Sequence, residues 1–358
     1  MTFYLDANAS EPPRPAALAA ADEAARTGGN PASIHQAGRA ARRILDDARD
    51  RVAARFGGPA AGLVFTSGGT EANALAVHGL GAGRRLLIGA TEHDAVRAAA
   101  GPGASVIGVD ADGVIDLEML RRELAGPPAL LCLMLANNET GTLQPVAEAA
   151  ALCRQAGALL HVDAVQAAGR IGVDLAALGA DSLAISGHKF GGIPGAGALL
   201  LAPGRELAAL IAGGGQERGR RGGTPALPAI AAMAAADAPA PDFAAARGRI
   251  EAAARRHGAV VMGAGAARLD NTSCLALPGV PAERQVIALD LAGYAVSAGA
   301  ACSSGKLARS HVLEAMGAGP LAGEAIRVSL PWNCDLAGLD GFIAAYQAMA
   351  LRLRPAAA

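Results

Sequence analysis

One lysine and one aspartate in the middle of the chain have the types and spacing of a cofactor site. Asp163 closes a short apolar run at residues 158–162, and Lys189 follows a second short run, 182–186, 26 residues further on. A lysine among glycines is unusual at the end of a buried strand. We predict that Lys189 binds a cofactor covalently and that Asp163 tunes its electronic properties.

Two further polar residues follow strand-like runs in the same way. His93 and Asn138 each come just after a short apolar run. Singly, each has a structural explanation, a surface histidine for His93 and an Asx turn for Asn138. Four consecutive strand ends that carry such groups are better explained by one site, because ligands bind at that edge of open α/β sheets.

A glycine-rich turn, Thr66 to Glu71, separates a short strand from a helix. Backbone N–H groups at such a helix start, together with the hydroxyls of Ser67 and Thr70, form an anion site. The turn matches neither the P-loop nor the dinucleotide-binding GxGxxG motif. An ordinary helix N-cap is the alternative.

Pyridoxal 5'-phosphate is a flat, anionic cofactor that needs this combination of groups. It requires a lysine for covalent attachment, a carboxylate on the pyridinium nitrogen and a cradle for its phosphate. Lys189, Asp163 and the 66–71 turn meet these three needs. Asn138 can hydrogen-bond the ring oxygen, and the His93 ring can stack on the cofactor and move protons.

Cys302 lies in a stretch of small residues, Ser297 to Gly305, whereas Cys132 and Cys153 fall in apolar patterns typical of a core. A glycine-rich setting gives access to solvent, and nearby basic side chains lower the pKa of a thiol. Cys302 is therefore a candidate nucleophile, and a structural role is the alternative.

Arg327 is a lone arginine that enters an apolar strand, in the sequence AIRVS. A guanidinium can clamp a substrate carboxylate through two parallel hydrogen bonds. The alternative is a structural salt bridge.

The composition excludes several classes of protein. The chain has 358 residues and a net charge of -1, which argues against a general nucleic-acid binder. Its N-terminus predicts no signal peptide, and no apolar run approaches the length of a membrane span. The five cysteines include no CxxC pair, so neither a disulfide framework nor a metal site is expected. These features favour the cytoplasm.

Short apolar runs alternate with helical stretches between residues 63 and 201, which predicts a mostly parallel α/β sheet covered on both faces. The runs are 63–65, 86–88, 105–109, 129–135, 158–162, 183–185 and 198–201, and helices are expected at 36–56, 117–125 and 145–156. After a Pro-rich stretch at 235–243, shorter elements predict a smaller α+β domain. We expect a large domain at 14–243 and a small domain at 1–13 plus 244–358.

The chain resembles the cysteine desulfurases, fold-type I pyridoxal-phosphate enzymes of aminotransferase class V, over nearly its whole length. The segments that carry the resemblance include FTSGGTEANALAV, TEHDAV, NNETGTLQP, HVDAVQAAG, SGHKFGG and SAGAACSSGKLARSHVLEAMG. SGHK together with the ACSSG stretch is highly specific. The resemblance implies conversion of L-cysteine to L-alanine, with transfer of the sulfur to Cys302 as a persulfide.

The resemblance also implies a role for each site residue. Lys189, His93 and Cys302 are the implied catalytic residues, and Arg327 and Asn138 bind the substrate. The residues implied to bind the cofactor are Gly69, Thr70, His93, Asn138, Asp163, Gln166, Ser186, His188, Lys189 and Thr224. Thr224 reaches the phosphate of the other subunit, so a homodimer is implied, and a sulfur-acceptor protein such as an iron–sulfur scaffold is the implied partner.

Three stretches depart from the family pattern, and the region around 235–270 is shorter than is typical of the family. The opening segment reads Asp6 to Ser10 as DANAS where DNNATT is usual, Gly191 to Gly195 lacks a second lysine, and Arg221 to Thr224 reads RGGT instead of RSGT. None removes a group that the chemistry needs. The alternatives are a selenocysteine lyase or another class V aminotransferase-type enzyme, which would not need Cys302, and an inactive sulfur-transfer scaffold.

Overall fold

The computed structural model describes residues 2–238, 241–299 and 309–353 of the chain. Its centre is a seven-stranded sheet in the strand order β2-β8-β7-β6-β5-β3-β4. The strands are β2 (Leu63–Thr66), β3 (Arg85–Gly89), β4 (Ser105–Ile107), β5 (Ala129–Met134), β6 (Leu159–Asp163), β7 (Ser182–Ser186) and β8 (Gly197–Leu201). Neighbouring strands from β7 to β4 run parallel, and only the pairings of β8 are antiparallel. The predicted mostly parallel α/β sheet is confirmed.

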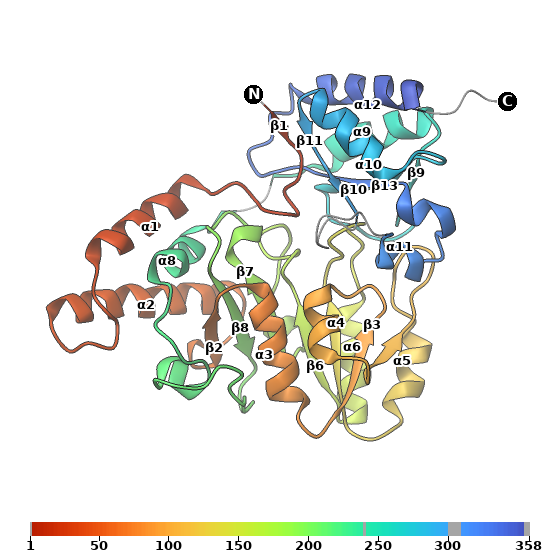
Figure 1. Cartoon of the computed structure of the whole chain (residues 1–358). Helices are drawn as coiled ribbons and strands as arrows, with labels where there is room; N and C mark the ends of the chain where they lie inside the picture. Colours follow the sequence, from red (N-terminus) through yellow and green to blue (C-terminus); the bar gives the residue numbers. More distant parts are fainter. Residues whose placement is uncertain (1, 239–240, 300–308, 354–358) are drawn as a thin grey trace.

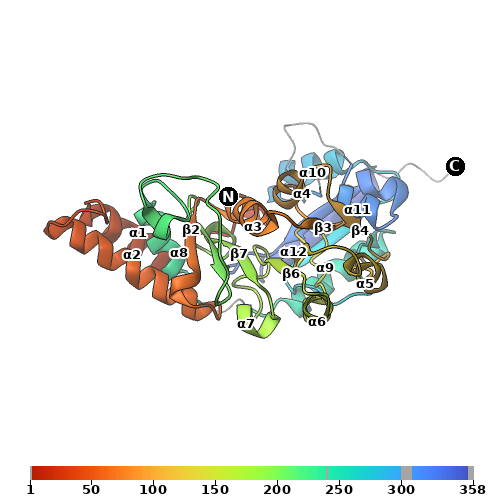
Figure 2. The same ribbon diagram turned by 90° about the horizontal axis from the view of Figure 1, so that it is seen from below.

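Helices cover both faces of this sheet (Figure 2). They are α1 (Pro15–Thr27), α2 (Gln36–Arg55), α3 (Gly69–Gly81), α4 (Asp94–Ala100), α5 (Leu117–Leu124), α6 (Val146–Ala156), α7 (Leu175–Leu178) and α8 (Leu227–Ala235). Alternate strand residues enter two separate cores, as the period of a strand requires. Leu131 and Leu133 pack toward α2, α5 and α6, whereas Leu130 and Cys132 pack toward α3 and α4.

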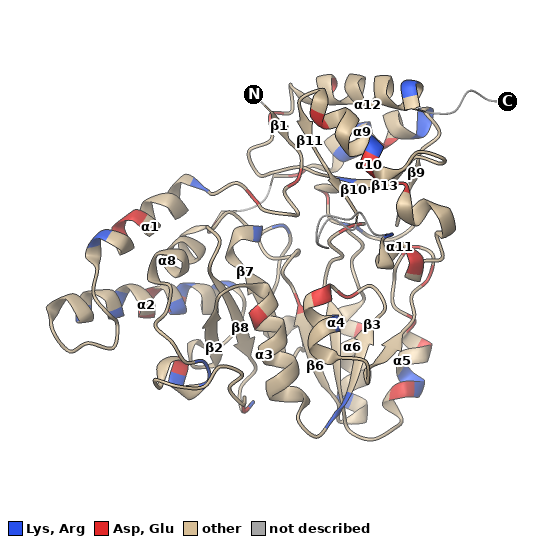
Figure 3. Cartoon of the chain, in the orientation of Figure 1, with Lys and Arg blue, Asp and Glu red and all other residues tan. Residues whose placement is uncertain are grey.

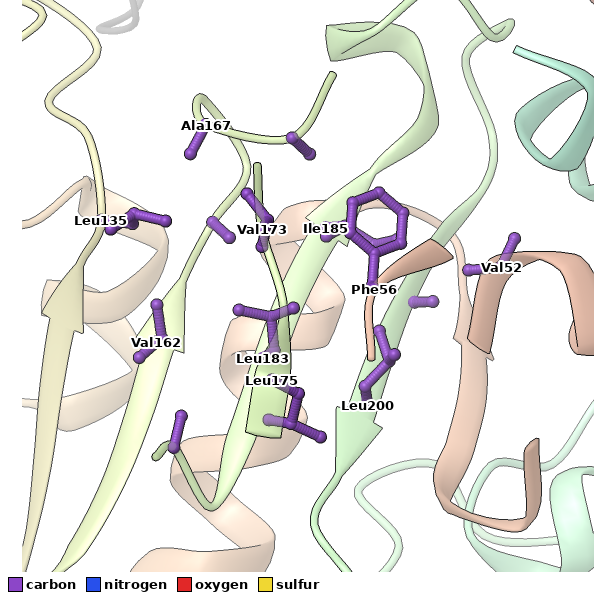
Figure 4. Close-up of a cluster of buried hydrophobic side chains, with 14 of the residues drawn as sticks. Val52, Phe56, Leu135, Val162, Ala167, Val173, Leu175, Leu183, Ile185 and Leu200 are labelled. Carbon is purple, nitrogen blue, oxygen red and sulfur yellow. The ribbon is translucent and has the colours of Figure 1, made fainter. Parts of the chain in front are cut away.

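Figure 4 shows part of the first of these cores, where Val162, Leu183 and Leu200 of three neighbouring strands face Phe56. Phe56 contacts Phe190 edge to face, with 6.0 Å between the ring centroids. Because Phe190 directly follows Lys189, this packing fixes the backbone that carries the lysine. The apolar core on one side of β7 therefore helps to position the chemistry at its end.

A second sheet, in the order β12-β13-β10-β9, is antiparallel throughout. Its strands are β9 (Val260–Val261), β10 (Thr272–Ala276), β12 (Ser297–Ala298) and β13 (Ala325–Ser329). The helices α9 (Ala244–Arg256), α10 (Ala282–Leu291), α11 (His311–Ala315) and α12 (Leu339–Leu353) come from the same part of the chain (Figure 1). The predicted boundaries of the two domains stay a prediction.

The N-terminal segment runs from a two-stranded sheet of its own, past the end of β13, to the turn after β7. The strand β1 (Phe3–Tyr4) pairs with β11 (Tyr294–Ala295), and Asp6 bridges to Ser329 at the end of β13. Further along, the backbone N–H groups of Glu11 and Arg14 donate to the carbonyls of His188 and Gly191, just beyond β7. The N-terminal segment 5–14 thus contacts both sheets close to Lys189.

Charged residues of both signs alternate on the outer helices, as α1 and α5 show in Figure 3. This mixed surface agrees with the net charge of -1. Within the described residues, none of the helices is long and apolar enough to cross a bilayer.

Candidate active site

The carboxyl ends of β3, β5, β6 and β7 meet around one cavity, because these four strands are parallel neighbours in the sheet. Nine of the residues that the sequence singled out line it. They are Gly69, Thr70, His93, Asn138, Asp163, Gln166, Ser186, His188 and Lys189. Asn73, Ala95, Met134, Ala136 and Val165 complete the lining. The structure therefore brings together residues that are far apart in the chain.

A directed chain of buried hydrogen bonds ends on Asp163. Asn73 Nδ2 donates to Asp163 Oδ2 at 2.6 Å, and Asn73 Oδ1 lies 2.9 Å from His161 Nε2. His161 Nδ1 lies 2.8 Å from Ser182 Oγ. Because burial lowers the pKa of His161 to about 3, its ring is neutral, with Nε2–H donating to Asn73 and Nδ1 accepting from Ser182.

The Asp163 carboxylate is buried, and burial raises its pKa. Four groups oppose this effect and favour the ionised form: the backbone N–H of Val165, His93, the Asn73 amide and Lys189. Val165 N donates to Oδ1 at 2.9 Å, so each carboxylate oxygen accepts one bond from protein. A carboxylate held in this way can stabilise a positive charge in the cavity.

The start of α3 and the end of β7 form a cradle for an anion. Gly69 and Thr70 open α3 and line the cavity. Ser186 Oγ is buried without a hydrogen-bond partner among the described residues, and it lies 3.8 Å from the position that a Cβ on Gly68 would take. An unsatisfied buried hydroxyl beside a helix N-terminus fits a phosphate group.

His188 lies at the same end of the cavity. Burial, together with the positive charge of Lys189, lowers the pKa of His188 to about 4, so its ring is neutral. Its Nδ1 lies 3.3 Å from Ser10 Oγ, which leaves Nε2 for a ligand.

Lys189 is half-buried and reaches the N-terminal segment. Its Nζ donates to the carbonyl oxygen of Asn8 at 2.6 Å and to that of Ala9 at 3.1 Å. The short 3-10 turn Gly187–Lys189 directly after β7 brings the side chain to this position. The amine therefore lies at the edge of the cavity, between β7 and the N-terminal segment.

His93 caps α4. Its Nδ1 accepts the backbone N–H of Ala95 at 3.0 Å, so in the neutral ring the proton is on Nε2. The neighbouring Glu92 is fully buried and accepts the backbone N–H of Met134 at 2.7 Å, which ties the turn after β3 to the end of β5. Burial holds the pKa of Glu92 well above its ordinary value.

The two asparagines after β5 have different roles. Asn137 Oδ1 accepts the N–H groups of Glu139 and Thr140, so the Asx turn at this strand end is made by Asn137 and not by Asn138. Asn138 lines the cavity, and its carbonyl oxygen accepts from Arg327 Nη1 at 3.1 Å. The turn made by Asn137 thus presents Asn138.

Arg327 is buried in β13 beside the cavity and pairs with Asp6, with 2.7 Å between Nη2 and Oδ1. The salt bridge that the sequence allowed as the alternative is present. It does not exclude substrate binding, because Nη1 reaches the carbonyl of the cavity-lining Asn138 and Nε has no hydrogen-bond partner among the described residues.

Three predicted site residues are not among those that line the cavity. Arg327 does not line it and reaches it only through its bond to the Asn138 carbonyl. Thr224 is exposed and does not line it in the single chain. Cys302 lies outside the described residues. Conversely, the sequence pattern did not mark Asn73, Asn8 or Glu139. Asn73 alone had a local signal, since it is a polar residue four positions after Gly69 and so on the same face of α3.

The geometry defines a fold-type I α/β enzyme with a lysine, an aspartate and an anion cradle around one cavity, and comparisons with known proteins agree. The sequence model of the family described as aminotransferase class V matches residues 3–342. The chain belongs to this family, whose members are pyridoxal-phosphate-dependent enzymes.

Individual relatives point to one branch. A curated cysteine desulfurase of Cereibacter sphaeroides is 43% identical over 333 residues, which cover 87% of this chain and 86% of that protein. The solved structure of a NifS-like protein from Rickettsia africae has a TM-score of 0.88 and 30% identity, with 98% and 99% of the two chains covered. A solved structure of SspA in complex with cysteine has a TM-score of 0.82 and 28% identity, covering 92% of this chain and 99% of that one.

Proposed function

We propose that the chain is a pyridoxal-phosphate-dependent cysteine desulfurase that converts L-cysteine to L-alanine and transfers the sulfur to Cys302. The observation that carries this proposal is the placement of Lys189 and Asp163 at adjacent strand ends on one cavity, in a chain 43% identical to a cysteine desulfurase. The relative that binds cysteine supports L-cysteine as the substrate.

The cavity fits the cofactor residue by residue. Ser186, Thr70 and His188 would hold the phosphate, Asp163 would pair with the ring nitrogen, and Lys189 would attach covalently. Gln166 Nε2 and Asn138 would face the ring oxygen, with His93 against the ring. When bound, pyridoxal phosphate supplies a sink for the electron pair of the substrate's α-carbon.

The side chains of the protein carry out the remaining steps. Arg327 holds the substrate carboxylate, an orientation that lowers the entropic barrier. Lys189 accepts the proton of the α-carbon. The Cys302 thiolate attacks the substrate sulfur, so that an S–S bond forms while the C–S bond breaks. The electron pair of the C–S bond remains on the β-carbon, which takes up a proton. Lys189 then returns its proton to the α-carbon, and alanine leaves.

His93 acts on protons at the substrate thiol. Because its Nδ1 accepts from Ala95, proton transfer runs through Nε2. The neutral ring donates a hydrogen bond from Nε2–H to the substrate sulfur, and Nε2 can take up the thiol proton only in the tautomer with the proton on Nδ1, in which the bond to Ala95 is given up.

Two parts of the proposal concern partners. Thr224, exposed in the single chain, would reach the phosphate of a second copy, so the enzyme would be a homodimer. The persulfide on Cys302 would pass to an acceptor protein, for iron–sulfur cluster assembly or for thiolation. Size-exclusion chromatography tests the first part, and a strictly monomeric active enzyme would contradict it.

The decisive experiment measures sulfide and alanine produced from cysteine. The wild-type chain loaded with pyridoxal phosphate should release both in equal amounts in the presence of a thiol reductant. Cys302→Ser should keep the visible absorbance of the bound cofactor and lose sulfide release, and Lys189→Ala should lose covalent attachment. Cys334→Ser, which changes a half-buried cysteine away from the cavity, is the matched control.

Retained turnover in Cys302→Ser would exclude the persulfide step. Selenocysteine, offered beside cysteine, separates the lyase alternative: a lyase would act on selenocysteine without Cys302. Conversion of the cofactor to its amine form by an amino donor would point instead to a transaminase.

A further inference from the structure

Asn8 is a buried junction between the two sheets. It is 1% exposed and is bonded through its backbone and its side chain. Its N–H donates to Ser329 Oγ at 3.0 Å, and its Nδ2 donates to Thr272 Oγ1 at 3.0 Å and to the carbonyl oxygen of Asn138 at 3.1 Å. The partners lie 130 to 321 positions away in the sequence.

The backbone carbonyl of Asn8 faces the other way, toward the cavity. It accepts from Lys189 Nζ at 2.6 Å and from Gln166 Nε2 at 2.9 Å. Asn8 thus contacts the amine of Lys189 through its backbone carbonyl, and it contacts the backbone carbonyl of Asn138 through its side-chain amide.

The Asn138 carbonyl leads on to Arg327. It accepts from Asn8 Nδ2 at 3.1 Å and from Arg327 Nη1 at 3.1 Å. Lys189, Asn8, Asn138 and Arg327 therefore form one continuous hydrogen-bonded path. The amine at one end and the guanidinium at the other are the two groups that would act on the α-carbon and the carboxylate of an amino acid.

We propose that Asn8 is a positioning residue that fixes the Lys189 amine relative to the Arg327 guanidinium, and so sets the site for an α-amino acid. The proposal rests on the proposed function for the identity of the substrate. It needs no cofactor for the contacts themselves, since each is made between residues of this chain.

Asparagine suits this place because its side chain both donates and accepts. Nδ2 donates to two oxygens, while Oδ1 accepts from Asn271 Nδ2 at 3.2 Å. Aspartate has the same shape, but it would place a charged oxygen against the carbonyl oxygen of Asn138. Both oxygens can only accept, so no hydrogen bond forms between them. Asn8→Asp therefore disturbs the path while it preserves the volume of the side chain.

The first readout is the chemical reactivity of Lys189. The sequence contains two lysines, Lys189 and Lys306, so acetylation by an N-hydroxysuccinimide ester can be followed at each by mass spectrometry. In the full-length chain freed of cofactor, Asn8→Asp should raise the labelling of Lys189 relative to Lys306 about fivefold, the factor for one lost hydrogen bond. In the loaded enzyme, KM for cysteine should rise by a similar factor, with a smaller change in kcat.

Asn271→Ala is the matched control, because Asn271 is also buried and bonds the Asn8 side chain but has no hydrogen bond to Lys189 or Asn138 among its described contacts. It should leave both readouts unchanged. Equal changes in Asn271→Ala, or an unchanged Lys189 labelling ratio in folded Asn8→Asp, would overturn the proposal. If Asn8→Asp does not fold, Asn8→Ser replaces it with the same two readouts, and an unchanged labelling ratio in that variant would overturn the proposal equally.

The labelling experiment also separates the two proposals. A wild-type chain that releases no sulfide from cysteine refutes the proposed function, yet the effect of Asn8→Asp on Lys189 labelling would still be measured.

Discussion

Asn73 donates a 2.6 Å hydrogen bond to Oδ2 of Asp163, although the two residues are 90 positions apart. Asn73 lies one helical turn after Gly69, on the face of α3 that covers the sheet. The helix α3 therefore contributes to both ends of the cavity. Its first turn forms the anion cradle, and its second turn holds the carboxylate that would pair with the cofactor ring. A shift of α3 would disturb both ends together.

We expect Asn73→Ala to weaken cofactor binding. Asp163 would lose the amide that opposes the effect of burial, so its pKa would rise further and less of it would be ionised. A hydrogen bond to a charged group contributes about 1.5–3 kcal/mol, so the affinity for pyridoxal phosphate should fall roughly tenfold or more. Titration of the cofactor-free chain with pyridoxal phosphate, followed by absorbance, measures this.

Ser182→Ala is the control, because Ser182 bonds the far side of His161 and not Asp163. It leaves one buried ring nitrogen unpaired, and so it should lower stability without a comparable loss of cofactor affinity. If both variants weaken the cofactor equally, the effect comes from general loosening and not from the Asn73–Asp163 bond.

Glu139 should make the stability of the protein depend on pH. Burial raises its pKa from 4.5 to about 7, against the opposing effects of the Ser310 hydroxyl, Arg327 and His93. The folded state therefore holds the proton more tightly than the unfolded state. The stabilisation of the folded state by this proton is fully present below pH 4.5 and is lost as the pH rises to about 7.

The variant Glu139→Gln removes this titration and keeps a group that can bond Ser310. The difference in free energy of unfolding between wild type and variant should shift by about 3 kcal/mol in favour of the variant between pH 4.5 and about pH 7. Denaturant unfolding of both proteins across this range measures it. Parallel pH profiles would show that Glu139 does not titrate in this way.

Much of the cavity is predictable because it depends on local pattern. The run Ala129 to Leu135 is continuously apolar, which predicts a buried parallel strand, and the strand β5 covers Ala129–Met134. Once neighbouring strands are parallel, their carboxyl ends must share an edge, so His93, Asn138 and Asp163 can be expected together from the sequence alone.

The rest of the site depends on contacts that leave no local pattern. Asn8 sits in a turn-rich segment, and its partners are more than 100 positions away, so nothing nearby in the sequence marks it.

The start of α1 is difficult to predict for a different reason, because prolines at positions 12, 13 and 15 suggest a turn. Pro15 is in fact the first residue of the helix, where its fixed φ and missing N–H do no harm.

The buried ion pair of Arg170 and Glu11 supplies a further prediction. Their atoms are 3.2 Å apart, both side chains are buried, and Arg170 also donates to Gln166 Oε1 at 2.7 Å. Arg170→Met would leave the Glu11 carboxylate buried without its partner, which costs about 3–5 kcal/mol of stability. Because burial already raises the pKa of Glu11, the loss should be larger at pH 8 than at pH 5, where the carboxyl can take up a proton.

The double variant Arg170→Met/Glu11→Gln tests the cause. The amide oxygen introduced by Glu11→Gln could still accept the backbone N–H of Trp332 that Glu11 Oε1 accepts now, but the side chain carries no charge. Thermal unfolding should show that the second change restores most of the stability at pH 8. A double variant less stable than Arg170→Met would mean that packing of the arginine, and not its charge, is what matters.

The last prediction separates two roles of His93. Its ring caps α4 through Nδ1, and the same ring faces the cavity. Asparagine is among the best N-cap residues, whereas alanine is among the poorest, so His93→Asn should keep the helix cap that His93→Ala loses, worth about 1 kcal/mol. Both variants lose the imidazole. Desulfurase turnover should therefore fall about 10²–10⁴-fold in each, as expected for a lost general acid–base.

Thermal unfolding and steady-state kinetics on the two variants give the answer together. The expected pattern is equal loss of kcat with unequal stability, His93→Asn being the more stable. If His93→Asn retains most of the turnover, the histidine acts only through the position of α4. Equal stability with unequal turnover would reverse the assignment, since the cap would then matter to catalysis and not to folding.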